Sequence, residues 1–280
     1  MNIALLHQLL QPVVLGLVQG LTEFIPVSSS GHLVIVRNLL GWSDQGALFD
    51  AVLHLATVVA IVIYFRDDVM MMLRSLRPSA QSHNTTQNRK LLVLLAVATV
   101  PAILVGLLLT DLIEGQSRSL AIVASLMIFT GLMFVLVEKI SVSRKSLSKL
   151  TFFDALGIGA AQAAALLPGI SRSGSTIMAG MYFGLKREDA ARYAFLLAIP
   201  ALLLAGGYAL FQMEVGQQAI NWLELGVGAV VSLFSSLLAI SFMMRFLKTN
   251  RLYGFAGYLI VIGVILLGLI LAHVKLPLTL

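Results

Sequence analysis

The chain has 280 residues, of which 59% are hydrophobic and only 11% charged, and its formal net charge is +6. A soluble domain carries about 25% charged residues, so this composition excludes an ordinary water-soluble fold and predicts a membrane protein. The absence of cysteine excludes disulfides, thiolate metal sites and a cysteine nucleophile. The positive charge lies mainly in short linkers, where it sets topology and meets anionic membrane lipids, and we expect no nucleic-acid partner.

Six segments are apolar over the length of about 20 residues that a membrane span needs. They lie at about 47–65, 90–110, 119–138, 190–211, 222–245 and 253–273. Two more apolar stretches, 8–40 and 152–185, are each interrupted near the middle by proline, glycine and serine. We therefore predict an all-α polytopic membrane protein with six transmembrane helices plus two re-entrant broken-helix hairpins.

Lysine and arginine gather in the linkers 66–90, 139–149 and 245–251, whereas the linkers 111–118 and 212–221 contain few. The positive-inside rule places the basic linkers in the cytoplasm. With six spans, this topology is consistent only if each interrupted stretch enters and leaves the membrane on the same side. The stretch 8–40 then enters from outside, and 152–185 enters from inside.

The two interrupted stretches repeat each other at an offset of 143 positions. The matching pairs are Gly16 and Gly159, Gln19 and Gln162, Ser28 and Ser171, Ser30 and Ser173, and Gly31 and Gly174. Because three spans separate the copies, the repeat is inverted, and the two interruptions are expected to meet near the membrane midplane. We predict one membrane domain over 1–280, with repeat 1 at about 8–138 and repeat 2 at about 152–273.

The interruptions have the features of an anion site. A short helix is expected to start near Ser30–Gly31 and another near Ser173–Gly174, with serines as N-caps. The N–H groups at such a start attract anions. Two converging helix starts beside Arg172 therefore predict a site for a strongly anionic group, and the arginine fork suits phosphate.

Other polar residues near the first interruption indicate catalysis in addition to anion binding. Glu23 follows Gln19 by four residues on one helix face, and His32 follows a cluster of three serines. Serine, histidine and glutamate together supply a nucleophile, a base and a group that orients the base. The alternative is that these serines only cap a helix, but charged residues buried in a membrane, here Glu23 and Arg172, are usually functional.

Asp50 and His54 lie four residues apart on one span and could face the same site. A structural pair inside the membrane accounts for them equally well. Both readings stay open at this point.

The segments QGLTEFIPVSSSGH (19–32) and LPGISRSGSTI (167–177) resemble the two signature motifs of the bacterial undecaprenyl-diphosphate phosphatase family of the bacitracin-resistance type. The span pattern is similar over essentially the whole chain. The resemblance implies a multi-pass enzyme of the bacterial inner membrane, with its site open to the extracytoplasmic side. Its substrate would be a polyprenyl diphosphate lipid, converted to the monophosphate carrier lipid of peptidoglycan synthesis, and the resemblance also implies a homodimer.

By position, the resemblance assigns the family's acidic pair to Gln19 and Glu23, its active-site serine to Ser29 and its histidine to His32. Its serine-arginine phosphate clamp falls on Ser171 and Arg172. The remaining residues expected to bind substrate are Ser28, Ser30, Gly31, Ser173, Gly174 and Thr176. The family is usually described as activated by Mg²⁺ or Ca²⁺, but Gln19 is neutral, so such an ion would depend on Glu23, the substrate phosphates and water.

The residues leave the mechanism open. In one version Ser29 attacks the terminal phosphorus and His32 takes its proton, while Glu23 orients His32 or ligates the metal. In another version His32 is the nucleophile, or it activates water directly. The competing functions are a transporter or flippase of a lipid phosphate or small anion, since inverted repeats are a carrier architecture, and, more weakly, a structural membrane scaffold.

Overall fold

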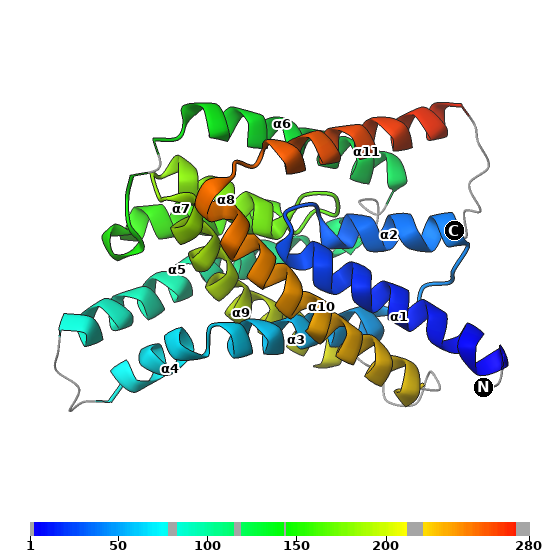
Figure 1. The fold of residues 1–280 in the computed structure, drawn as a ribbon, viewed down its shortest axis with the longest axis horizontal. Helices are drawn as coiled ribbons and strands as arrows, with labels where there is room; N and C mark the ends of the chain where they lie inside the picture. The colour runs from blue at the N-terminus through cyan, green and yellow to red at the C-terminus, as the bar shows by residue number, and fades with distance from the viewer. Residues whose placement is uncertain (1–2, 78–82, 115–118, 143, 212–220, 273–280) are drawn as a thin grey trace.

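The computed structural model of the chain describes residues 3–77, 83–114, 119–142, 144–211 and 221–272, and these are almost entirely helical. The first half contains α1 Ile3–Phe24, α2 Ser29–Leu40, α3 Ala47–Tyr64, α4 Arg66–Ser75, α5 His83–Glu114 and α6 Leu120–Ile140. The second half contains the short 3-10 helix η2 Leu147–Lys149, then α7 Phe152–Ala164, α8 Arg172–Tyr182, α9 Arg187–Phe211, α10 Trp222–Thr249 and α11 Tyr253–Leu271. Figure 1 shows their arrangement.

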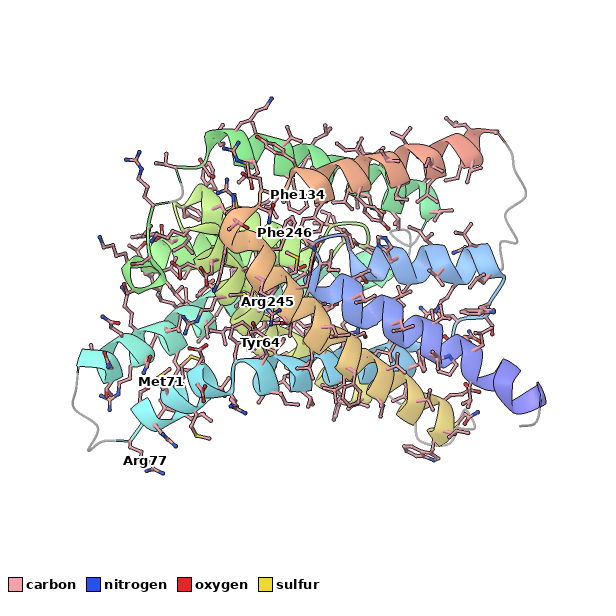
Figure 2. All side chains as sticks on the ribbon, viewed as in Figure 1. Tyr64, Met71, Arg77, Phe134, Arg245 and Phe246 are labelled. Atoms are coloured by element: carbon pink, nitrogen blue, oxygen red, sulfur yellow. The ribbon has the colours of Figure 1, made fainter. Side chains whose placement is uncertain are left out.

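Among the described residues, six helices are long and apolar enough to cross a membrane, namely α3, α5, α6, α9, α10 and α11. They coincide with the six predicted spans, which confirms that part of the prediction. The predicted outside linkers 111–118 and 212–221 fall mostly outside the described residues. Arg77, within the basic linker 66–90, lies at the opposite end of the molecule from the start of α1 (Figure 2).

The surface of the helix assembly is apolar, as expected for a protein surrounded by lipid. Side chains such as Leu108, Phe234 and Leu238 are more than half exposed, whereas Phe134 on α6 is completely buried. Figure 2 shows side chains projecting outward along the whole length of the helices. The chain is therefore a multi-pass membrane protein.

Two pairs of helices, α1–α2 and α7–α8, form hairpins, and the connection of α1 to α2 lies near the middle of the molecule (Figure 1). Each reversal contains a residue with left-handed backbone, Ser28 with φ 73° and Gly169 with φ 101°. A Cβ atom at Gly169 would lie 2.6 Å from the carbonyl oxygen of Val123, so this position requires glycine. The predicted interruptions at 26–32 and 168–176 are thus real breaks between helices.

A contact away from the turn links the two arms of each hairpin. At the first hairpin, the side-chain amide of Gln11 on α1 donates to the carbonyl of Ser43, just beyond α2, at 3.1 Å. At the second, Lys145 and Leu185 form an isolated backbone bridge before α7 and after α8. The second hairpin is therefore closed at its ends, whereas the contact in the first hairpin lies eight residues inside the start of α1.

The first hairpin is fixed against α10 by small residues. A Cβ atom at Gly16 would lie 2.6 Å from the carbonyl oxygen of Gly228, and one at Gly20 would lie 2.0 Å from Oγ of Ser235. Close approach through small residues is how helices associate without a hydrophobic driving force between them. This contact sets the depth and rotation of α1, and with it the position of the polar residues near its end.

Candidate active site

The two helix starts in the hairpins have matching serine caps. Oγ of Ser28 accepts from the N–H of Gly31 at 3.3 Å, and Oγ of Ser171 accepts from the N–H of Gly174 at 3.0 Å. The caps are themselves separated by the offset of the repeat, and both lie within two residues of the predicted helix starts. The serine clusters do act as caps, as the alternative interpretation holds, but Ser29 has a different partner.

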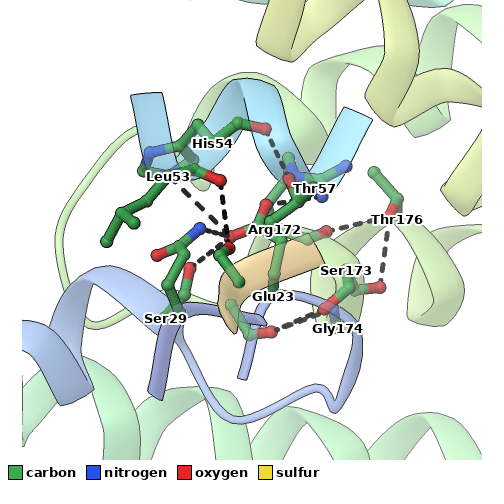
Figure 3. Close-up of polar contacts among 12 residues, drawn as sticks. Glu23, Ser29, Leu53, His54, Thr57, Arg172, Ser173, Gly174 and Thr176 are labelled. Atoms are coloured by element: carbon green, nitrogen blue, oxygen red, sulfur yellow. Dashed lines mark hydrogen bonds and ion pairs between the residues drawn. The ribbon is translucent and has the colours of Figure 1, made fainter. Parts of the chain in front are cut away.

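Glu23, near the end of α1, is the centre of the site (Figure 3). Its Oε2 accepts from Nε2 of Gln19 at 2.9 Å and from Oγ of Ser29 at 2.6 Å. Its Oε1 accepts from Nη2 of Arg172 at 2.7 Å. Glu23 is only 4% exposed, so a carboxylate here needs these donors and the guanidinium charge to remain ionised. The residues of the two motifs are therefore joined directly.

Arg172 has hydrogen-bond donors without a partner among the described residues. Its Nε and Nη1 atoms are buried and have no hydrogen-bond partner among the described residues. A buried donor without a partner is costly, and hydrogen bonds from a guanidinium to phosphate oxygens are charge-assisted and strong. Arg172 can thus bind an anion while Nη2 still contacts Glu23.

His32 lies beside this cluster but does not contact Ser29 through either ring nitrogen. Its Nδ1 is 2.8 Å from the carbonyl oxygen of Ser28, and its Nε2 is 2.7 Å from the hydroxyl of Tyr258 on α11. The geometry therefore differs from the expectation that His32 takes the proton of Ser29 and that Glu23 orients His32. Both nitrogens already have partners, and the serine hydroxyl points to Glu23 instead.

A second histidine stands nearer to Glu23 than His32 does. Nε2 of His54 on α3 lies 3.8 Å from Oε2 of Glu23, while its Nδ1 is 2.7 Å from the backbone oxygen of Asp50. His54 thus belongs to the surroundings of the site, and Asp50 does not. The carboxylate of Asp50 pairs with the buried Arg37 instead, with 2.5 Å between Nη2 and Oδ1.

The remaining predicted residues of the second motif line the start of α8. Ser171 and Ser173 are almost fully buried, and their hydroxyl oxygens lie 3.3 Å apart. The hydroxyl of Thr176 donates to the backbone oxygens of Arg172 and Ser173, so it stabilises the first turn of the helix. In the first motif, Ser30 is half-buried and follows Ser29 on α2.

The residues present do not form a resident metal site. Within the described part of the chain, no group of three or more histidine, aspartate or glutamate side chains is placed to hold an ion. Both oxygens of Glu23 already accept hydrogen bonds, and one of them faces the charge of Arg172. The amide oxygen of Gln19 is buried without a partner, but one amide oxygen is too few for Mg²⁺ or Ca²⁺.

Together, the fold and the site define a multi-pass helical membrane protein in which a partly buried serine and arginine contact a buried glutamate. The family model described as "Bacitracin resistance protein BacA" matches residues 12–265. The chain belongs to this family, as its two motifs indicate.

Curated relatives cover nearly the whole chain. A protein of Teredinibacter turnerae named undecaprenyl-diphosphatase is 39% identical over 92% of this chain and 98% of its own length. Proteins with that name from Myxococcus xanthus and Synechococcus elongatus are each 41% identical, over 94% and 92% of this chain and 89% and 91% of their own lengths. The region matched by the family model includes both motif loops.

Proposed function

We propose that this protein is an undecaprenyl-diphosphatase, which hydrolyses undecaprenyl diphosphate to undecaprenyl phosphate and inorganic phosphate. The carrier lipid is thereby recycled for cell-wall synthesis. The observation that carries the proposal is the contact of Ser29 and Arg172 with one buried carboxylate, Glu23. A site that only transported the anion would need the arginine but no serine activated by a carboxylate.

In the proposed first step, the spare donors of Arg172 and the N–H groups at the starts of α2 and α8 hold the diphosphate. Oγ of Ser29 attacks the terminal phosphorus, and its proton passes to Oε2 of Glu23. The bond between the terminal phosphorus and the bridging oxygen breaks, and the lipid monophosphate leaves. Positioning and charge stabilisation supply most of the rate enhancement in phosphoryl transfer.

Binding of the diphosphate also prepares Glu23. In the structure, Arg172 is the counter-ion of this carboxylate. A bound phosphate competes for the guanidinium, and a carboxylate that shares its counter-ion accepts the proton of Ser29 more readily. In the second step, water attacks the phosphoserine and passes one of its protons to a phosphate oxygen, the bond between phosphorus and Oγ breaks, and Oγ takes the proton back from Glu23.

The predicted dependence on Mg²⁺ or Ca²⁺ stays a prediction. Since Glu23 is already satisfied by Arg172, Gln19 and Ser29, we propose that an activating cation would arrive with the phosphates of the substrate. No step above passes through it. Measuring activity against cation concentration at two substrate concentrations tests this. If the cation binds together with the substrate, the cation concentration that gives half-maximal activity should change with the substrate concentration.

We also propose that α1–α2 and α7–α8 are re-entrant hairpins, that the two halves form an inverted repeat and that the site faces the outside of a bacterial inner membrane. The support is the link between the arms of each hairpin through the Gln11–Ser43 and Lys145–Leu185 contacts, together with the offset of 143 between the caps Ser28 and Ser171. The homodimer rests on the family resemblance alone.

Release of phosphate by the purified protein in detergent is the decisive test. A transporter or flippase of lipid phosphate needs a membrane barrier and releases no phosphate in detergent, whereas a phosphatase does. The serine variant Ser29→Ala serves as the matched inactive protein. If wild-type protein releases no more phosphate than a mock purification without the protein, the proposal fails.

A further inference from the structure

The ring of His32 connects the first motif loop to a helix near the other end of the chain. Its partner Tyr258 lies 226 positions away on α11, and neither motif contains it. The two rings stack, with centroids 5.6 Å apart and planes at 12°. The hydroxyl of Tyr258 is also 2.7 Å from Nε2 of His32, so the phenol ring lies nearly parallel to the imidazole and offset from it, with its hydroxyl at the imidazole edge.

The hydrogen bonds define the tautomer of His32. A carbonyl oxygen can only accept, so Nδ1 carries the proton that points to Ser28. In the neutral ring Nε2 then holds the lone pair, and the hydroxyl of Tyr258 donates to it. The same carbonyl accepts the backbone N–H of His32 at 3.0 Å, and the left-handed backbone of Ser28 is a strained conformation of the kind found at functional sites.

The lone pair of His32 therefore faces α11 and not the nucleophile. Ser29 has its own proton acceptor in Glu23 at 2.6 Å, so His32 is left for another proton transfer, in which the proton donor must take the place of the Tyr258 hydroxyl at Nε2. Glu23 is 4% exposed, whereas Tyr258 is 43% exposed. The basic nitrogen thus faces a residue that reaches the surface of the helix assembly, and not the buried carboxylate.

Building on the proposed phosphatase function, we propose that Tyr258 is a positioning residue of the active site, which sets the tautomer and the orientation of His32. Its hydroxyl stabilises the neutral ring with the lone pair on Nε2. Its ring restricts rotation of the imidazole. Without the hydroxyl, Nε2 loses its fixed partner and the imidazole is no longer held in one working geometry.

The test is Tyr258→Phe, which keeps the stacked ring and removes only the hydroxyl. Loss of one hydrogen bond should lower kcat by about three- to tenfold with KM changed less than about twofold. The matched control is Tyr253→Phe on the same helix, which should retain the wild-type kcat. In a His32→Gln background, Tyr258→Phe should lower kcat by less than about twofold, because a residue that acts through His32 has nothing left to position.

A second measurement does not depend on activity. With ¹⁵N-labelled histidine, the His32 signal, assigned by its loss in His32→Gln, should show protonated Nδ1 and unprotonated Nε2, and Tyr258→Phe should change the Nε2 shift. An unchanged kcat in Tyr258→Phe, equal losses with and without His32, or an unaffected Nε2 signal would each overturn the inference. If the wild type releases no phosphate, the proposed function fails, while the spectrum still tests the pair.

Discussion

Nη2 of Arg172 donates a 2.7 Å hydrogen bond to Oε1 of Glu23, and 149 positions separate the two residues. The two side chains are only 14% and 3% exposed. Removing one member of a buried ion pair typically costs about 3–5 kcal/mol, because the other charge remains without compensation. This pair therefore holds the two motif loops together and also keeps a guanidinium in place for the phosphates.

The first prediction is that Arg172→Lys does not rescue Arg172→Ala. An ammonium can replace the charge opposite Glu23, but it cannot replace the planar donors at Nε and Nη1. Losing one preorganised donor to a developing phosphoryl charge typically costs about 10²–10³ in rate, so the lysine variant should be slower by at least about that factor, and alanine slower still. Phosphate release by equally monodisperse proteins measures this.

The matched control for this substitution is Arg187→Lys. Arg187 also pairs with a buried glutamate, Glu138, but at the junction of α6 and α9. Glu138 also accepts the backbone N–H of Leu252 before α11. We expect Arg187→Lys to lower the melting temperature and to leave kcat nearly unchanged. Near-wild-type activity in Arg172→Lys would remove the clamp from the mechanism.

The second prediction is that Ser29→Ala abolishes turnover in a folded protein. The hydroxyl is the proposed nucleophile, so the rate should fall by at least about 10³, while the lost hydrogen bond to Glu23 should cost only about 1–2 kcal/mol of stability. Ser125→Ala on α6, whose hydroxyl bonds only to the backbone of its own helix at Ala121, is the control. Substantial turnover in Ser29→Ala would favour His32 or water as the attacking group.

The third prediction concerns the packing that positions α1. A Cβ atom at Gly20 would lie 2.0 Å from Oγ of Ser235 and 2.4 Å from the carbonyl oxygen of Ser232. Gly20→Ala should therefore push α1 away from α10, lower the stability by about 1–3 kcal/mol and reduce activity through Glu23. Thermal unfolding in detergent measures the first effect.

Gly226→Ala on α10 makes the same change where a Cβ atom meets nothing within 4 Å. Its stability should stay unchanged or rise by up to about 1 kcal/mol, because alanine is the better helix former. Equal melting temperatures for Gly20→Ala and Gly226→Ala would contradict the close approach of α1 and α10.

The spans and the serine caps could be predicted from the sequence because their signals are local. Hydropathy over about 20 residues identifies a span without knowledge of its neighbours, and the caps follow from serines just after Pro26 and before Gly174. The meeting of the motif loops was also predictable, since an inverted repeat requires it. The direct contact between Glu23 and Arg172 confirms that the loops meet.

The partners of individual side chains could not be predicted in the same way. Which residue of α3 or α11 faces the site depends on how the helices rotate against one another, and the sequence does not define that angle. Spacing in the sequence therefore did not decide whether His54 faces the site, and it gave no indication that Tyr258 does. It also paired Ser29 with His32, because both lie at the start of one helix, whereas the hydroxyl of Ser29 points to Glu23.

The fourth prediction tests the re-entrant hairpins with single cysteines, since the natural chain has none. Ser43, Ser148 and Lys186 are exposed and lie after α2, before α7 and after α8. If α7–α8 is a re-entrant hairpin, both of its ends lie in the cytoplasm, where their linkers are predicted to be. Ser148→Cys and Lys186→Cys should then react with a membrane-impermeant maleimide only after spheroplasts are lysed. Ser43→Cys, three spans earlier, should react in intact spheroplasts. Opposite accessibility of Ser148→Cys and Lys186→Cys would mean that α7–α8 crosses the membrane, which contradicts the inverted repeat.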